Sequence, residues 1–238
     1  MISESFGRLA LAAGVSALFA LAAWSVGLVR VSGALAGALL AALVGWALGA
    51  GGFGLLALFV VAGSAATRLG YRQKAARGLA EERGGRRGAA HAFANLGTAA
   101  VCAVISAWRP ESPAWRIAFA GALATALADT VGSEAGKLWG RKPRSPLTGR
   151  SVAAGTRGAV SLPGTLAGVA AAALLATVGA LGGLYPARSV AAITLAAFLG
   201  SLAESLLSAA TPSRPLLPHH PLNFANTLLG ASLAAWLG

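Results

Sequence analysis

The sequence predicts an all-α protein, a polytopic transmembrane bundle of about eight helices. Hydrophobic residues make up 56% of the 238 residues and charged residues only 11%. The mean hydropathy of +0.70 lies outside the range of soluble domains. Apolar runs of about 20 residues, the length that crosses a bilayer, recur along the chain with short connections between them. We therefore expect a single integral membrane domain over residues 1–238.

Each expected helix is an apolar run between polar or glycine-rich breaks. The runs lie near residues 9–29, 31–49, 50–66, 90–107, 115–133, 160–182, 187–208 and 222–237. The first run is a retained helix rather than a cleaved signal peptide, because Glu4 precedes it and further spans follow directly. Glycines four residues apart let helices approach closely. Such pairs are Gly33/Gly37, Gly45/Gly49 and Gly164/Gly168.

The chain is strongly basic, with 19 Lys and Arg against 7 Asp and Glu and a net charge of +12. In a membrane protein the distribution of these cations reports topology, so we expect no nucleic-acid partner. When the basic loops 67–89 and 134–159 are placed in the cytoplasm, all but four cations fall on that side. The four are Arg8, Arg109, Arg116 and Arg188. We predict a protein of the cell (plasma) membrane with cytoplasmic basic loops and outward-facing termini.

Two of the seven acids stand in one apolar run. Asp129 and Glu134 lie in ALADTVGSEAGKLWG, and charged groups at membrane depth usually serve a function. On an unbroken helix a separation of five residues turns the two side chains about 140° apart. One interpretation makes both acids part of a site, and the other pairs them with Lys137 or an interhelical Arg to lock the bundle. Glu204 in SLAES repeats the pattern of ALADT, so we expect it to approach Asp129.

The loop after Glu134 has the composition of a phosphate-binding loop. The stretch from Thr148 to Gly168 is dense in glycine and hydroxyl residues, and glycine lets backbone N–H groups turn toward an anion at the start of a helix. The segment GSEAGK is not a Walker A loop, because its spacing is one residue short and Leu138 replaces the Ser or Thr. The candidate phosphate-binding residues are Lys137, Arg141, Arg144, Arg150, Gly155, Thr156, Arg157, Gly158 and Ser161.

A divalent cation would complement this loop. Magnesium prefers a few carboxylates together with phosphate oxygens and water. The candidate catalytic and metal-binding residues are therefore Asp129, Glu134 and Glu204, and the candidate polar support comes from Asn95, Ser133, Asn223 and Asn226. His91 is expected at the membrane interface, and His219 and His220 lack the partners of a zinc site. Cys102 is expected to be a small buried residue.

Five segments resemble a known family, and together they cover most of the chain. They are RRGAAHAFANLG (Arg86–Gly97), ADTVGSEAGKL (Ala128–Leu138), TGRSVAAGTRGAVSLPGTLAG (Thr148–Gly168), LGSLAESLL (Leu199–Leu207) and NFANTLLGA (Asn223–Ala231). The sequence resembles the DUF92, or transmembrane protein 19, family of integral membrane proteins, which includes a plant phytyl-phosphate kinase. At Glu204 this chain has the longer acid where the family pattern leads us to expect Asp.

The resemblance implies Mg²⁺-dependent transfer of a phosphoryl group from a nucleoside triphosphate, CTP or a related nucleotide, to an isoprenoid monophosphate such as phytyl or prenyl phosphate at the cytoplasmic face. The residues agree, because this chemistry needs positioning and charge neutralisation more than a special nucleophile. The partners are then the isoprenoid phosphate lipid, the nucleotide and membrane lipids, with a homo-oligomer left open. Two alternatives remain: a transporter or lipid flippase with a midplane acidic site, and a lipid-phosphate cytidylyltransferase.

Overall fold

The computed structural model describes residues 2–210 and 219–238. The helices are α1 (Ile2–Ser25), α2 (Val31–Arg68), α3 (Tyr71–Ala76), α4 (Ala89–Trp108), α5 (Ala114–Trp139), α6 (Leu162–Leu181), α7 (Ser189–Ala210) and α8 (His219–Leu237), with a short 3₁₀ turn, η1 (Glu82–Gly85), before α4. Within these residues the chain forms no strand beyond isolated bridges, so the predicted all-α class is confirmed.

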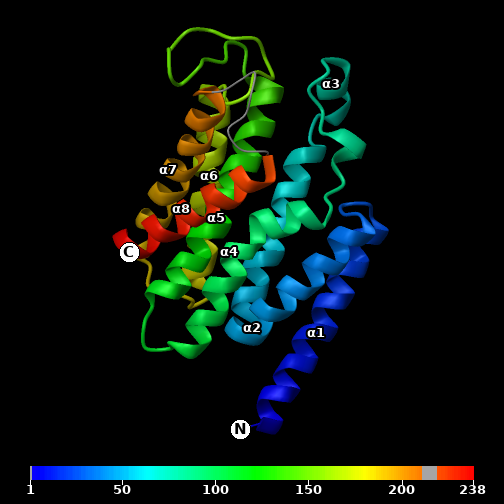
Figure 1. Ribbon diagram of the computed structural model, residues 1–238, viewed down its shortest axis with the longest axis vertical. Helices are drawn as coiled ribbons and strands as arrows, with labels where there is room; N and C mark the ends of the chain where they lie inside the picture. Colours follow the sequence, from blue (N-terminus) through cyan, green and yellow to red (C-terminus); the bar gives the residue numbers. More distant parts are fainter. Residues whose placement is uncertain (1, 211–218) are drawn as a thin grey trace.

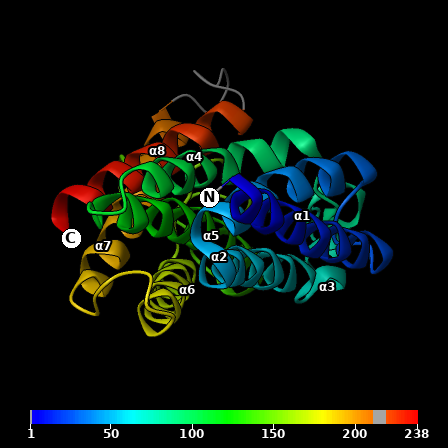
Figure 2. The ribbon, with the colours of Figure 1, turned by 90° about the horizontal axis from the view of Figure 1, so that it is seen from below.

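Helix α5 is the centre of the bundle (Figure 2). It packs against α2, α4, α6, α7 and α8, and it is buried without interruption from Ile117 to Ala128. Half of this stretch is alanine, and it contains one glycine; such small residues let neighbouring helices approach on all sides. The acids of α5 therefore enter the middle of the protein rather than lipid. Helix α1 is peripheral and packs mainly against α2.

The outer surface of the bundle is apolar. Five helices in the described ranges are long and apolar enough to cross a membrane, namely α1, α2, α4, α6 and α7. Large side chains such as Leu11, Leu35 and Leu181 are 69–84% exposed. A surface of this kind needs lipid around it. Together with its helical architecture, this makes the chain an integral membrane protein.

Helix α2 contains two of the predicted segments. Gly49 has φ +64° and ψ −154°, a conformation that only glycine adopts readily. At this residue the chain turns back, so the two halves of α2 form a V (Figure 1). The eight predicted segments are thus found as α1, the two halves of α2, and α4 to α8. Helix α3, which the sequence did not indicate, lies within the basic loop 67–89.

Glycines form the contact between α5 and α6. A Cβ atom on Gly164 would lie 2.5 Å from the carbonyl oxygen of Gly132, and one on Gly168 would lie 2.7 Å from that of Ala128. Since no side chain fits at these distances, the contact requires glycine on α6. The predicted Gly164/Gly168 contact is confirmed, whereas a Cβ on Gly37 would meet nothing within 4 Å.

Both basic loops lie at the same end of the bundle (Figure 1). This basic end carries α3, η1 and the long connection from α5 to α6, while the N-terminus and the turns near residues 109–113 and 182–188 lie at the opposite end. Arg214, assigned to the same side from sequence, is outside the described residues. The structure thus gathers the cations as predicted, and their placement in the cytoplasm stays a prediction.

Candidate functional site

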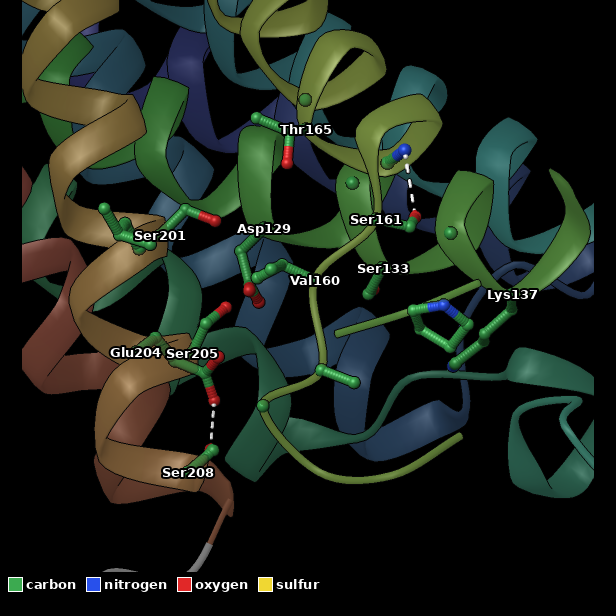
Figure 3. A pocket seen from close by; sticks show the side chains of 18 of the residues that line it. Asp129, Ser133, Lys137, Val160, Ser161, Thr165, Ser201, Glu204, Ser205 and Ser208 are labelled. Atoms are coloured by element: carbon green, nitrogen blue, oxygen red, sulfur yellow. Dashed lines mark hydrogen bonds between the residues drawn. The ribbon is translucent and has the colours of Figure 1, made fainter. Parts of the chain in front are cut away.

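A cavity of about 280 Å³ opens between α5, α6 and α7 near the basic end. Asp129 of α5 and Glu204 of α7 line it, and Figure 3 shows their side chains reaching the same space from facing helices. Ser208 donates a hydrogen bond to Glu204 Oε1 at 2.9 Å. We call this space the carboxylate cavity. The predicted approach of Glu204 to Asp129 is confirmed, because the SLAES and ALADT segments face each other across it.

Residues 154–161, which we call the glycine-rich loop, cover one side of the carboxylate cavity. Gly155 has φ +85° and Gly158 has φ +69°, values that favour glycine. A Cβ on Gly158 would lie 2.3 Å from the carbonyl oxygen of Ser205, so the loop packs directly on α7. Ser161 caps α6 by accepting a hydrogen bond from the N–H of Gly164 at 3.3 Å. The loop and the start of α6 thereby form one wall of the cavity that the two carboxylates line.

The predicted phosphate-binding residues divide into two groups. Those that line the carboxylate cavity are Lys137, Gly155, Thr156, Arg157, Gly158 and Ser161. Arg141, Arg144 and Arg150 are exposed and do not line it. The Arg144 guanidinium donates to the carbonyl oxygen of Gly149 at 2.8 Å, and the Arg144 backbone pairs with Val160. Arg144 therefore holds the loop in shape, because its side chain folds back onto the loop.

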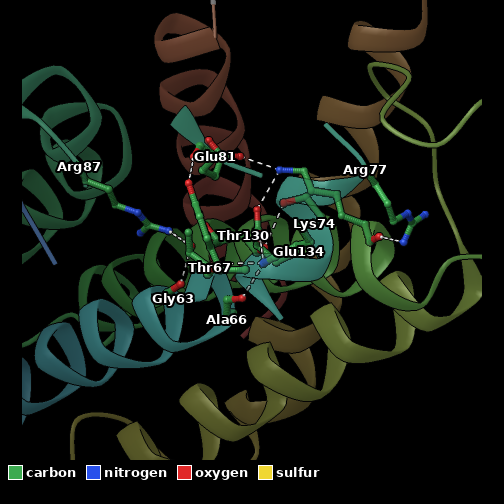
Figure 4. A network of polar contacts seen from close by, with 12 residues as sticks. Gly63, Ala66, Thr67, Lys74, Arg77, Glu81, Arg87, Thr130 and Glu134 are labelled. Carbon is green, nitrogen blue, oxygen red and sulfur yellow. Dashed lines mark hydrogen bonds and ion pairs between the residues drawn. The ribbon is translucent and has the colours of Figure 1, made fainter. Parts of the chain in front are cut away.

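Glu134 belongs to a separate buried ion cluster (Figure 4). One carboxylate oxygen pairs with Lys74, whose side chain is 0% exposed, and the other accepts a hydrogen bond from Lys137 at 2.8 Å. Lys74 also donates to the carbonyl oxygens of Thr67 and Ala66, at 2.8 and 3.3 Å. Both oxygens of Glu134 are bound to ammonium groups, and its role as a metal ligand stays a prediction. The observed contacts match the alternative interpretation, in which Glu134 forms ion pairs that hold the bundle together.

Glu81 extends this cluster to the basic loop. Lys137 donates to Glu81 Oε1 at 2.6 Å. Burial raises the pKa of the Glu81 carboxyl, but the hydrogen bond and the charge of Lys137 lower it by more, so the pKa lies below its ordinary value. The loop before α4 is therefore tied to the end of α5 by an ionised pair at neutral pH.

A second cavity, of about 420 Å³, adjoins the first. It is lined by Arg30, Arg86 and Arg87, and we call it the arginine cavity. Asp129 and Ser133 line both cavities, so the two spaces meet at Asp129. Sequence reasoning assigned these arginines to topology alone and missed Lys74 and Glu81 as cluster members. The sequence feature that could have indicated these residues is the loop 67–89, which contains acids as well as cations and leads into α4.

The three asparagines predicted as polar support lie in different surroundings. Asn223 lines the arginine cavity, whereas Asn95 donates to the carbonyl oxygen of His91 at 2.9 Å and Asn226 is buried in α8. Thr98 of α4 and Thr227 of α8 join these two helices by a hydrogen bond of 3.0 Å. Of the residues predicted as polar support, Ser133 and Asn223 line the carboxylate or the arginine cavity, and Asn95 lines a further, apolar cavity.

Three or more His, Cys, Asp and Glu side chains do not gather into a metal cluster anywhere in residues 2–210 and 219–238. Three carboxylates line the carboxylate cavity, Glu81, Asp129 and Glu204. Glu81 is paired with Lys137, which leaves Asp129 and Glu204 for a cation. The ion pairs found in these ranges involve Glu81 and Glu134 and neither of those two acids. His219 lines both cavities, and Cys102 is a free, buried thiol.

Comparison with known proteins identifies the family. The family model described as integral membrane protein DUF92 matches residues 14–217. The chain belongs to this DUF92 family. The match includes α5, the glycine-rich loop and α7, so the carboxylate cavity lies within the family region. No solved structure matches this DUF92 chain.

Relatives of the DUF92 chain come from a cyanobacterium, a plant and an archaeon. An uncharacterized membrane protein of Synechocystis sp. is 38% identical over 193 residues, which are 79% of this chain and 74% of the relative. Protein VTE6, chloroplastic, of Arabidopsis thaliana is 36% identical over 210 residues, 85% of this chain and 63% of the relative. An uncharacterized membrane protein of Methanocaldococcus jannaschii is 36% identical over 115 residues, 48% of each chain. The alignment therefore spans less than two thirds of the length of the last two relatives.

Proposed function

We propose that this DUF92 protein transfers the terminal phosphoryl group of a nucleoside triphosphate, CTP in the first instance, to an isoprenoid monophosphate such as phytyl or prenyl phosphate. The observation that carries the proposal is the pair of carboxylates, Asp129 and Glu204, facing one cavity beneath a glycine-rich loop (Figure 3). The relationship to VTE6 supports the acceptor class, because the family resemblance implies a phytyl-phosphate kinase.

For this reaction the protein must position the two substrates and neutralise the charge of their phosphate groups. An oxygen of the acceptor phosphate attacks the γ-phosphorus, the bond from that phosphorus to the β-γ bridging oxygen breaks, and its electron pair leaves with the nucleoside diphosphate. The products are the lipid diphosphate and the nucleoside diphosphate. A phosphate monoester already carries a negatively charged oxygen, so the attack needs no strong base.

The donor nucleotide would lie in the carboxylate cavity. Arg157 supplies positive charge there, and Thr156 and Ser161 supply hydroxyl groups. Lys137 also lines this cavity, with its ammonium paired to Glu81 and Glu134. The positive end of the α6 dipole also points to this wall, since α6 begins at Leu162. These groups would hold the phosphates of the nucleotide and fix the γ-phosphoryl group near Asp129.

Magnesium fits Asp129 and Glu204. The cation prefers one or two carboxylates with phosphate oxygens and water, and neither acid has an ion pair within the described ranges. Bound there, Mg²⁺ would neutralise charge on the phosphates. Glu134 has no part in this assignment, because its oxygens are paired with lysines.

The direction of access favours an enzyme over a transporter. The non-helical walls of the carboxylate cavity, residues 154–161 with Glu81 and Pro143, belong to the loops of the basic end. Its helical walls extend from that end to about the middle of α5 and α7, at Ala128 and Phe198. A transporter site would need access from both ends. We place the basic end in the cytoplasm, where nucleoside triphosphates are available, and the protein in the plasma membrane.

The test is a product analysis with purified protein. Detergent-purified protein and Mg²⁺ are incubated with each labelled nucleoside triphosphate and a panel of isoprenyl monophosphates. We expect labelled lipid diphosphate from the wild type and none from Asp129→Asn, with both proteins equally folded. Release of pyrophosphate with a CDP-lipid would instead assign a cytidylyltransferase. Absence of both turnover and nucleotide binding by folded protein would overturn the proposal in favour of transport.

A further inference from the structure

The arginine cavity continues into a third, apolar cavity. The two share Arg87, Gly88 and His91 in their walls. The third cavity, of about 60 Å³, lies between α1, α2 and α4, and Phe19, Leu56 and Phe59 are among the residues that line it. We call it the apolar cavity. The arginine cavity also carries the acids Glu81, Glu82, Asp129 and Glu134, but the wall that it shares with the apolar cavity is formed by Arg87, Gly88 and His91. A basic wall that opens into an apolar space has the polarity of an anionic amphiphile.

Polar groups at the junction lack partners of opposite charge. The half-buried Arg87 guanidinium donates to the Thr67 hydroxyl at 3.2 Å (Figure 4), and no carboxylate of the described chain lies within ion-pair distance of it. Nε2 of His91 is buried and has no hydrogen-bond partner among the same residues. Buried cations and donors are stabilised by an anion, so this junction suits a phosphate group.

We propose that the junction is the acceptor site: the isoprenoid monophosphate binds with its phosphate at Arg86, Arg87 and His91 and its first isoprene units in the apolar cavity. The inference rests on the proposed function and adds the location of the lipid. The arginine fork matches phosphate oxygens, and Arg30 adds charge at the same cavity wall.

This placement brings donor and acceptor to one point from two sides. The nucleotide occupies the carboxylate cavity and the lipid phosphate the arginine cavity, and both cavities reach Asp129 and Ser133. An attacking oxygen and a γ-phosphoryl group must meet roughly in line. Two cavities that meet at one carboxylate provide this arrangement without a rearrangement of the helices.

The tail leaves the site through the side of the bundle. The apolar cavity is too small for a complete long-chain isoprenoid, so the distal units extend into the bilayer. Helix α1 forms one wall of the cavity and packs mainly against α2, which leaves the α1–α4 side as the exit. The enzyme would then act on a substrate that never leaves the membrane.

One wall position allows a clean test. Gly37 lines the apolar cavity, and a Cβ there would meet nothing within 4 Å. Gly37→Leu should fill the cavity without disturbing the fold. Gly54→Leu is the matched control, because Gly54 is on the same helix, is equally open and lines none of the three cavities. We expect Gly37→Leu to raise the KM for phytyl phosphate about tenfold or more, with the KM for CTP and the melting temperature unchanged. A KM for phytyl phosphate equal to that of Gly54→Leu would overturn the inference.

Photo-crosslinking tests the location independently of turnover. Farnesyl phosphate that carries a diazirine in its first isoprene unit is irradiated with the protein, and labelled peptides are mapped by mass spectrometry. We expect label in α1, α2 and α4, and Arg87→Gln should reduce it. Turnover with label in α6 and α7 would keep the proposed function and overturn this inference. Label in α1, α2 and α4 without turnover by any nucleotide would support the lipid site and refute the kinase.

Discussion

Burial decides the different roles of the two acids of α5. Glu134 is 3% exposed and accepts from two lysines, whereas Asp129 lines two cavities and has no ion pair among the described residues. The turn of about 140° between them sends one toward α3 and the other toward α7. The two acids of this apolar segment therefore differ in their surroundings: Glu134 is part of an ion cluster, and Asp129, which we propose as a site residue, faces the cavities.

Loss of the Glu134 charge should destabilise the protein. In Glu134→Gln the buried ammonium of Lys74 loses its carboxylate, and an uncompensated buried charge costs about 3–5 kcal/mol. Thermal unfolding in detergent should show a large fall in melting temperature. The double variant Lys74→Met with Glu134→Leu should recover most of it, because no unpaired Lys74 charge remains. Equal stability of Glu134→Gln and wild type would contradict the buried cluster.

The proposed kinase activity should survive the replacement of Glu204 by a shorter acid and should be lost when its charge is removed. Glu204→Asp restores the residue that the family pattern leads us to expect, so we predict kinase activity within about tenfold of wild type. Glu204→Gln removes the charge and should lower kcat about 100-fold or more, the scale of losing one electrostatic contact in an active site. Steady-state kinetics with saturating CTP checks both. Full activity of Glu204→Gln would remove Glu204 from the site.

Glu81 should make stability depend on acid pH. Its folded pKa lies below the ordinary value of 4.5, so the pair with Lys137 contributes stability above about pH 4.5 and loses it as the pH falls through the folded pKa. Chemical unfolding from pH 7 to pH 3 should show Glu81→Gln less stable than wild type at pH 7, with the difference vanishing at the acid end. Glu111→Gln, an exposed acid at the opposite end of the bundle, serves as the control. A difference that grew on acidification would refute the pairing.

At the scale of elements, the contact between α5 and α6 sets the shape of the carboxylate cavity. Gly132 and Gly164 both line that cavity and both belong to the contact. Because the helices touch through backbone, a single methyl group must push them apart. Packing and site geometry are therefore coupled at these positions.

Gly164→Ala should impair both stability and activity. Its Cβ would lie 2.5 Å from the carbonyl oxygen of Gly132, an overlap that costs about 1–3 kcal/mol. We expect a lower melting temperature and reduced kcat. Gly54→Ala, where a Cβ meets nothing within 4 Å, should change neither. Wild-type values for Gly164→Ala would mean that the helices are less closely packed.

At the scale of the whole molecule, the basic end defines one face of the protein. The two basic loops and the rims of the carboxylate and arginine cavities lie at this end, and the turns near residues 109–113 and 182–188 lie at the other (Figure 1). In the proposed reaction a soluble nucleotide would therefore reach the site from one side of the membrane. The orientation of the protein decides which compartment supplies it.

Cysteine labelling should show that the basic end is cytoplasmic. Cys102 is buried and should not react with the reagent. Labelling therefore reports a single cysteine introduced at an exposed alanine. In intact cells an impermeant maleimide should label Ala187→Cys and spare Ala153→Cys until the membrane is permeabilised. The reverse pattern would place the loops outside and separate the site from cytoplasmic nucleotides.

The sequence alone determined the all-α membrane class, the eight long segments, the gathering of the cations and the approach of Glu204 to Asp129. These are local properties, because hydropathy, charge distribution and a repeated short pattern are visible along the chain. It also indicated the loop at Gly155 and Gly158, since glycine and hydroxyl density reports a backbone that must bend.

Only the tertiary structure decided which charges pair. Lys74 lies 60 residues before Glu134, and no sequence pattern in either segment predicts that the two residues form a pair. The same holds for Arg87 and His91, which become neighbours of Asp129 only when α2, α4 and α5 pack together. Partner choice depends on which side chains the packing removes from water, and packing joins residues that are distant along the chain. The division of the polar interior into a structural cluster, a carboxylate cavity and an arginine cavity is therefore a property of the fold.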